Sequence, residues 1–157
     1  MLINKEIWFS KPSGFNDPFD CNIDIDSTFD DVQIMRGLDK KIDYLRNEVK
    51  KLKKENKYAY FCACNNCVHT LMWSHYANNH KGIAFGFTFA DLTPEMINYV
   101  KGVDYLMNEV ENSYNLMCEN NDCDEVSIKA AANYMFKILR FLKAECWQYE
   151  KKTGVRS

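Results

Sequence analysis

The chain has 157 residues and a formal net charge of −2, which predicts a single folded domain spanning 1–157. Hydrophobic residues make up 46% of it and aromatic residues 14%, a composition too apolar for a disordered chain. The near-neutral charge gives the whole molecule no electrostatic bias toward nucleic acid or acidic membranes. No secretory signal is visible, and the longest apolar stretch, 83–90, is about half of the roughly 20 residues that span a bilayer. We therefore predict a cytoplasmic protein with no membrane segment, and we do not expect nucleic acid as its partner.

The first part of the chain predicts two strands separated by a loop and a long helix. Residues 6–10 are short and aromatic and indicate a strand, and the turn formers of 15–20 indicate a loop. A long amphipathic helix near 30–56 follows from apolar residues spaced three and four apart. These residues are Met35, Leu38, Ile42, Leu45, Val49 and Leu52. Several lysines between 50 and 57 suit the negative end of that helix, and the aromatic run 58–63 predicts the next strand.

The second part predicts shorter elements and a second long helix. Residues 70–77 indicate a short helix, and 82–89 indicate a strand with its phenylalanines on one face. Thr93 followed by Pro94 predicts a helix start, and 103–107 predicts a strand. A helix near 125–147 is predicted from one apolar face, made of Ala131, Tyr134, Met135, Ile138 and Leu142. The fold class predicted is therefore α+β, a small mixed or antiparallel sheet with several helices.

Polar residues in the 15–20 loop form the first candidate site. Asn16, Asp17 and Asp20 stand between two phenylalanines, and together they could hold a ligand hydroxyl or amide. The alternative is a structural turn, in which the Asn and Asp side chains bond nearby backbone N–H groups and the two rings anchor the loop.

Seven cysteines are present, and four potential metal ligands lie close together. Cys62, Cys64, Cys67 and His69 include the Cys-x-x-Cys spacing of half a zinc site. No second such pair follows, and an odd cysteine count argues against a complete disulfide framework. We predict reduced thiols and no bound metal.

Two aromatic-polar clusters are the remaining candidates. The first holds Trp73, His75 and Tyr76, followed by His80. Ser74 and His75 are adjacent and cannot face each other on a helix, so a Ser–His nucleophile is not expected there. Either histidine could act as a ligand donor or a general base, the alternative being a structural histidine.

The second cluster, Trp147, Tyr149 and Glu150, follows the last predicted helix. It could form the edge of a ligand site, in which Glu150 orients a hydroxyl or stabilises a developing positive charge. The alternative is a solvated terminus with two packed rings.

Taken together, these segments resemble the bacterial family called domain of unknown function 2971. The resemblance is carried by five motifs in order: Trp8-Phe9-Ser10-x-Pro12, Phe15-Asn16-Asp17-Pro18-Phe19-Asp20, Trp73-Ser74-His75-Tyr76-Ala77, His80-Lys81-Gly82-Ile83 and Lys143…Trp147-x-Tyr149-Glu150-Lys151. It covers nearly the whole chain, and its motifs are specific in combination although each is weak alone.

The family's layout is similar to the ADP-ribosyltransferase fold, and the resemblance therefore implies NAD as a cofactor. Glu150 would be the catalytic acid that holds the nicotinamide ribose hydroxyl, with Ser10 at the end of a sheet segment as its catalytic partner. Trp73 and Tyr76 would shape the pocket, and cleavage would pass through a cation-like ribose stabilised by Glu150. The implied setting is a toxin or a phage-defence system.

Two departures from the family pattern predict a truncated or degenerate copy. Relatives carry about one more strand before Trp8, and beyond the Tyr-Glu motif they continue with a further Glu and an Arg. An incomplete sheet would leave an unpaired edge through which copies could associate. The partner expected is an unknown small molecule or nucleotide. The main rival hypothesis is a non-enzymatic binding or interaction domain, with the stripe from Met35 to Leu52 facing either a partner or the core.

Overall fold

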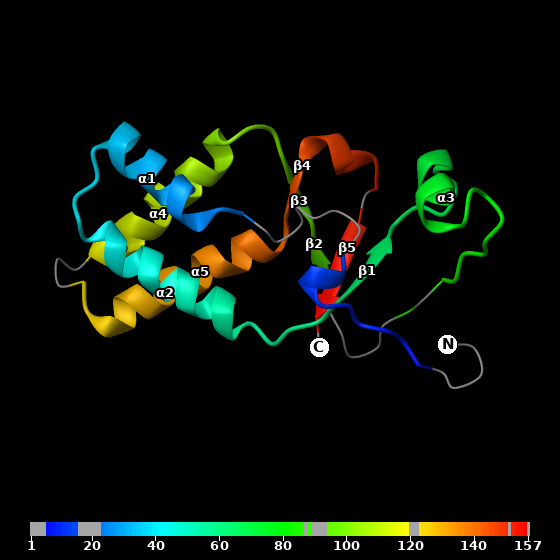
Figure 1. Cartoon of the computed structure of the whole chain (residues 1–157), viewed down its shortest axis with the longest axis horizontal. Coiled ribbons are helices and arrows are strands. Elements are labelled where there is room, and N and C mark those ends of the chain that lie inside the picture. Colours follow the sequence, from blue (N-terminus) through cyan, green and yellow to red (C-terminus); the bar gives the residue numbers. More distant parts are fainter. Residues whose placement is uncertain are drawn as a thin grey trace.

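The computed structural model describes residues 6–15, 23–86, 88, 94–119 and 123–150, and the backbone of 152–156. Helices gather at one end of the molecule and short strands at its centre, while one short helix lies beyond the strands (Figure 1). The predicted α+β class is confirmed. No helix in the described part of the chain combines the length and the apolar composition needed to cross a membrane.

Four helices form the bundle that holds the hydrophobic core. They are α1 (Ile25–Arg36), α2 (Ile42–Glu55), α4 (Asp104–Cys118) and α5 (Glu125–Arg140). Asp24 and Asp124 cap α1 and α5 by accepting hydrogen bonds from the backbone N–H groups of Ser27 and Ser127, at 3.3 and 2.7 Å. Fully buried side chains from all four helices meet in this core, among them Phe29, Leu45, Val110 and Met135.

The long helix predicted near 30–56 is wrong as a single element, because the chain breaks at Gly37. That glycine has φ of +66°, the left-handed conformation that ends α1, and α2 starts at Ile42. The predicted apolar stripe divides in the same way. Met35 is 69% exposed at the end of α1, whereas Leu45 and Val49 are fully buried. The α2 part of the stripe therefore faces the core and not a partner, which was one of the two alternatives predicted from the sequence.

Two small sheets join the bundle to the rest of the chain. In the first, β5 (Lys152–Arg156) lies between β1 (Tyr60–Cys64) and β2 (Glu95–Met96), and both pairings are antiparallel. In the second, β3 (Asn98–Val100) runs parallel to β4 (Leu142–Ala144). Ser10 forms an isolated antiparallel bridge with Tyr60. Among the described residues, this bridge is the only pairing made by the strand predicted at 6–10.

Four other segments differ from the elements predicted from the sequence. The helix expected after Thr93 is wrong, because β2 and β3 occupy 95–100 and pair with β5 and β4. The strand expected at 103–107 is also wrong, since α4 begins at Asp104 and buries Leu106, Met107 and Val110 at helical spacing. The helix predicted over 125–147 ends at Arg140, because 142–144 pair with β3. No strand is present at 82–86, and part of that predicted strand lies outside the described residues.

Two short elements complete the fold and position the candidate site. Helix α3 (Thr70–Tyr76) follows β1 and confirms the short helix predicted there. The 3-10 helix η2 (Glu145–Glu150) connects β4 to β5 and contacts α3. A second 3-10 turn, η1 (Pro12–Gly14), follows Ser10 at the bundle end of β1.

Candidate functional site

Glu150 stands at the end of η2 with its side chain fully buried, at 0% exposure. Its Oε2 lies 2.8 Å from Nζ of Lys143, whose side chain is 5% exposed. Its Oε1 accepts a 2.6 Å hydrogen bond from the hydroxyl of Tyr76 on α3. Burial of a lone carboxylate or ammonium costs several kcal/mol, so each charge here depends on the other. We call Tyr76, Lys143 and Glu150 the buried triad.

Aromatic rings surround the buried triad. The ring of His75 lies 6.2–6.3 Å from the rings of Tyr76, Trp147 and Tyr149. The ring of His69 stacks on Tyr149 with centroids 5.6 Å apart and 24° between the planes. These separations are within the range in which aromatic rings attract one another. We call His69, His75, Tyr76, Trp147 and Tyr149 the ring cluster, and α3 and η2 contribute most of it.

The charges of the triad act on the rings beside them. Nζ of Lys143 lies 4.7 Å from the centroid of the Trp147 ring, a cation–π arrangement. Burial raises the pKa of the Tyr149 phenol, and the negative charge of Glu150 raises it further, against a smaller opposing effect of Lys143. Tyr149 is therefore a neutral hydrogen-bond donor and acceptor at neutral pH.

An open cavity of about 290 Å³ lies against α3. Its walls come from β1, α3 and the segment after α3. The apolar part of the wall consists of Phe61, Ala63, Met72, Trp73, Ala77, Ile83, Ala84 and Phe85. Tyr76 also lines this cavity and donates its hydroxyl to Glu150, so it connects the cavity to the buried triad. We call this space the α3 cavity.

Hydrogen bonds hold two of the aromatic side chains that line the α3 cavity. The indole Nε1 of Trp73 donates to the backbone carbonyl of Cys67 over 2.6 Å, and Tyr76 is held by Glu150. Two rings with fixed planes form a preorganised stacking surface, because a ligand need not restrict them on binding.

The structure brings some of the residues predicted from sequence together but not all of them. Trp73, His75, Tyr76, Trp147, Tyr149 and Glu150 come together around the triad and the α3 cavity. His80 lies exposed in the turn after α3, with φ of +67°, and its backbone N–H donates to Trp73. Asn16, Asp17 and Asp20 lie outside the described residues.

Ser10 lies at the opposite end of the sheet from Glu150. It pairs with Tyr60 at the start of β1, whereas Cys64 at the other end of β1 pairs with Lys152, two residues beyond Glu150. Four residues of extended strand separate these points, which corresponds to about 13 Å. The paired catalytic role predicted for Ser10 and Glu150 would therefore require a substrate that spans this distance, and it stays a prediction.

The cysteine and histidine cluster does not form a metal centre in the described part of the chain. No group of three His, Cys, Asp or Glu side chains is placed there to hold a metal ion. Cys62, Cys64 and Cys67 are exposed cysteines that form no disulfide and line the α3 cavity, and His69 packs on Tyr149 instead.

Lys143 is the residue whose importance the sequence pattern did not reveal. It lies in the short strand β4, between α5 and η2, and a lysine is seldom fully buried. The sequence indicates Lys143 only as the first residue of the motif that ends at Glu150. The structure shows that the side chains of Lys143 and Glu150 are paired and buried.

Comparison with known proteins gives one family match. The family model described as "Protein of unknown function (DUF2971)" matches residues 72–152, which include Trp73, Tyr76, Lys143 and Glu150. No curated protein and no solved structure matches the chain. The match extends from α3 to the beginning of β5 and so contains the buried triad.

Proposed function

Since the chain belongs to the DUF2971 family of proteins of unknown function, and the family match contains the buried triad, we propose that this region binds a small molecule with a flat ring, such as a nucleotide base. The observation that carries the proposal is the α3 cavity, where Trp73 and Tyr76 are both fixed by hydrogen bonds. Apolar walls with a few fixed polar groups are typical of small-molecule sites.

In this proposal, stacking of the ligand ring on Trp73 and Tyr76 supplies the binding affinity, and the buried triad holds the stacking surface in position. Contact between a base and an aromatic side chain contributes about 1–3 kcal/mol. Glu150 and Lys143 neutralise each other away from solvent, so their role is to hold Tyr76 and Trp147 in place. The thiols of Cys62, Cys64 and Cys67 line the same cavity and add polarisable surface.

Replacing Trp73 with alanine is expected to weaken ligand binding by about tenfold or more, because one stacking ring is lost. Isothermal titration with adenosine, nicotinamide and NAD measures the dissociation constants. Trp8→Ala is the matched control, since Trp8 is 81% exposed and does not line the α3 cavity. Absence of binding by all three compounds to the folded wild-type chain, or equal weakening by both substitutions, would contradict the proposal.

A second candidate function is cleavage of NAD between nicotinamide and ribose, as in ADP-ribosyl transfer. The observation that favours it is that Glu150, the acid implied by the family resemblance, contacts a residue of the α3 cavity wall. Nicotinamide would leave with the electron pair of the glycosidic bond, and the carboxylate would stabilise the cationic ribose until an acceptor attacks it. Glu150 would have to exchange its bond with Tyr76 for one with the ribose, so binding without catalysis ranks first.

For this second function, incubation with NAD is expected to release nicotinamide, measured by chromatography, and Glu150→Gln is expected to abolish the release. Ser10→Ala tests the implied partner without touching the buried triad. A circular dichroism spectrum and a melting curve of each variant separate lost chemistry from lost folding. Undetectable release by the wild type, or full release by a folded Glu150→Gln variant, would contradict it.

A further inference from the structure

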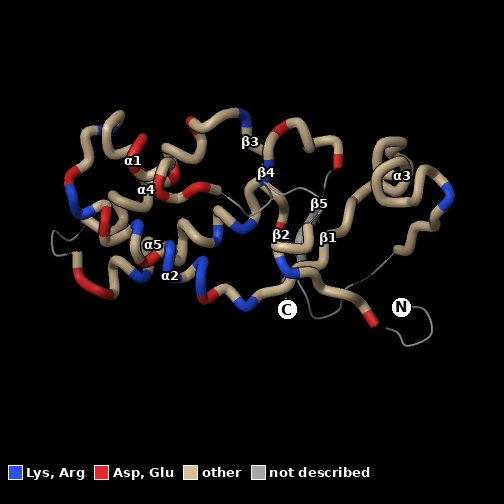
Figure 2. The backbone as a smooth tube through the Cα atoms, viewed as in Figure 1, with Lys and Arg blue, Asp and Glu red and all other residues tan. Residues whose placement is uncertain are grey.

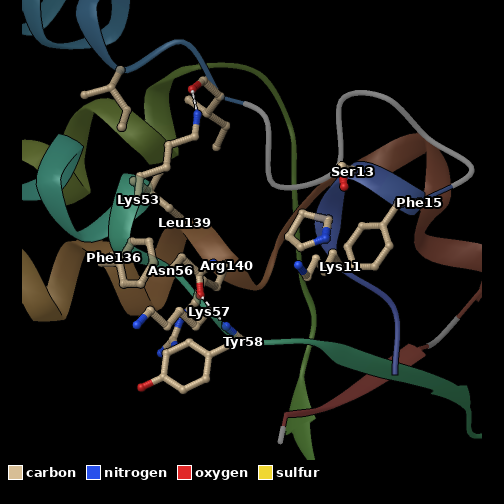
Figure 3. A pocket seen from close by; sticks show the side chains of 13 residues that line it. Lys11, Ser13, Phe15, Lys53, Asn56, Lys57, Tyr58, Phe136, Leu139 and Arg140 are labelled. Atoms are coloured by element: carbon tan, nitrogen blue, oxygen red, sulfur yellow. Dashed lines mark hydrogen bonds between the residues drawn. The ribbon is translucent and has the colours of Figure 1, made fainter. Parts of the chain in front are cut away.

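A second, larger cavity of about 820 Å³ lies where the bundle meets the sheet. The turn η1 lies on one side, with Lys11 and Phe15, and the ends of α2 and α5 lie on the other, with Lys57, Tyr58 and Arg140 (Figure 3). Its described lining residues are Lys11, Pro12, Ser13, Phe15, Ile23, Ile25, Lys53, Asn56, Lys57, Tyr58, Phe136, Leu139 and Arg140. None of the residues discussed for the α3 cavity lines this space, so it is a separate feature. We call it the basic cavity.

Every charged residue among the described lining residues is a cation. Lys11 and Lys57 are exposed, and neither forms an ion pair with any described acidic residue. The guanidinium of Arg140 lies 5.2 Å from the Tyr58 ring centroid and 5.0 Å from that of Phe136, which fixes its position against the wall. In Figure 2 the cationic segments at the ends of α2 and α5 lie between the bundle and the sheet.

The helix dipole explains only part of this concentration of positive charge. Lys53 and Lys57 lie at or just beyond the C-terminal end of α2, where cations are stabilised. Lys11 directly precedes η1 and Arg140 ends α5, so the fold brings cations from three separate segments to one concave surface. The chain as a whole carries a net charge of −2, so the excess of positive charge around this cavity does not follow from the overall composition. Like charges in a cavity repel one another and attract an anion.

The remaining lining residues indicate the kind of anion. Ser13 and Asn56 are neutral groups that can bond a ligand, and Pro12, Phe15 and Leu139 provide apolar surface. The volume is within the range of small-molecule sites, roughly 300–1,000 Å³. Several cations around one space suit a multiply charged group with several acceptor oxygens. We infer that the basic cavity binds a phosphate-bearing small molecule that also has an apolar or flat part.

The test is isothermal titration of the chain with pyrophosphate, ATP and citrate at low and moderate salt. Pyrophosphate and ATP are expected to bind, ATP more tightly because its base and ribose reach the apolar wall, and affinity is expected to fall as salt rises. Lys57→Gln and Lys11→Gln are each expected to raise the ATP dissociation constant about three- to tenfold, which corresponds to roughly 0.7–1.4 kcal/mol. Both side chains are exposed, so neither variant should lose its fold.

The matched control is Lys40→Gln, which removes the same charge from an exposed site outside the basic cavity. Equal weakening by Lys40→Gln would show general charge attraction and overturn the inference, as would citrate binding as tightly as ATP. Absence of any binding would overturn it as well. Trp73→Ala, which damages the α3 cavity, is expected to leave pyrophosphate affinity unchanged, so failure of one proposal is distinguishable from failure of the other.

Discussion

Replacing Glu150 with alanine is expected to lower the free energy of unfolding by about 3–5 kcal/mol, because Lys143 is left as an uncompensated buried charge. The side chains of both residues are almost completely excluded from solvent and lie 2.8 Å apart. Loss of the carboxylate also removes the acceptor of the Tyr76 hydroxyl. Urea unfolding followed by circular dichroism measures the change, and the slope with denaturant should stay constant if only stability is altered.

Two further variants distinguish the cost of removing one partner of the ion pair from the cost of replacing both partners with apolar side chains. Lys143→Met alone is expected to destabilise the fold by a similar amount, since it leaves the carboxylate buried without a counter-charge. The double variant with methionine at both positions is expected to recover most of the loss, because apolar side chains of similar size need no partner in a buried site. Together with the single variant Glu150→Met, these variants form a double-mutant cycle that gives the coupling energy. Single variants that lose less than about 1 kcal/mol, the value typical of exposed ion pairs, would show that the pair is hydrated in solution.

The sequence predicted the composition of the candidate site better than its geometry. The motif around Trp73 and the motif ending at Glu150 are separated by about 70 residues, yet they share the hydrogen bond between Tyr76 and Glu150. Aromatic and acidic residue types could be recognised directly. The burial of Lys143 could not, because it depends on how η2 folds back over β4, a contact between elements that no local pattern encodes.

In the fold as well, elements determined by local sequence were predicted correctly, and elements determined by distant contacts were not. The short helix α3 and strand β1 were predicted because their patterns are local and agree with their environment. The strand predicted at 103–107 failed because short apolar runs fit either a strand or a helix, and the later buried positions of α4 decided it. β2 and β3 were missed because their pairing partners, β5 and β4, are distant in the sequence.

The break between α1 and α2 at Gly37 predicts a large difference in stability between two substitutions in the same apolar stripe. Leu45→Ala is expected to lower the free energy of unfolding by about 2–5 kcal/mol, because Leu45 is fully buried in the bundle core and its loss leaves a cavity. Met35→Ala is the matched control. It belongs to the same apolar stripe in the sequence but is 69% exposed, so a change within about 0.5 kcal/mol is expected. Chemical denaturation of both variants checks the pair.

A continuous helix from 30 to 56 would place both residues on one buried face, and the two substitutions would then have comparable costs. Size-exclusion chromatography adds a second readout, since loss of Met35 changes the apparent mass only if that exposed side chain lies between copies of the chain. Equal destabilisation by the two variants would contradict the break at Gly37. A large cost at Leu45 alone would show that one stripe of sequence serves two environments, separated by a glycine whose left-handed backbone turns the chain.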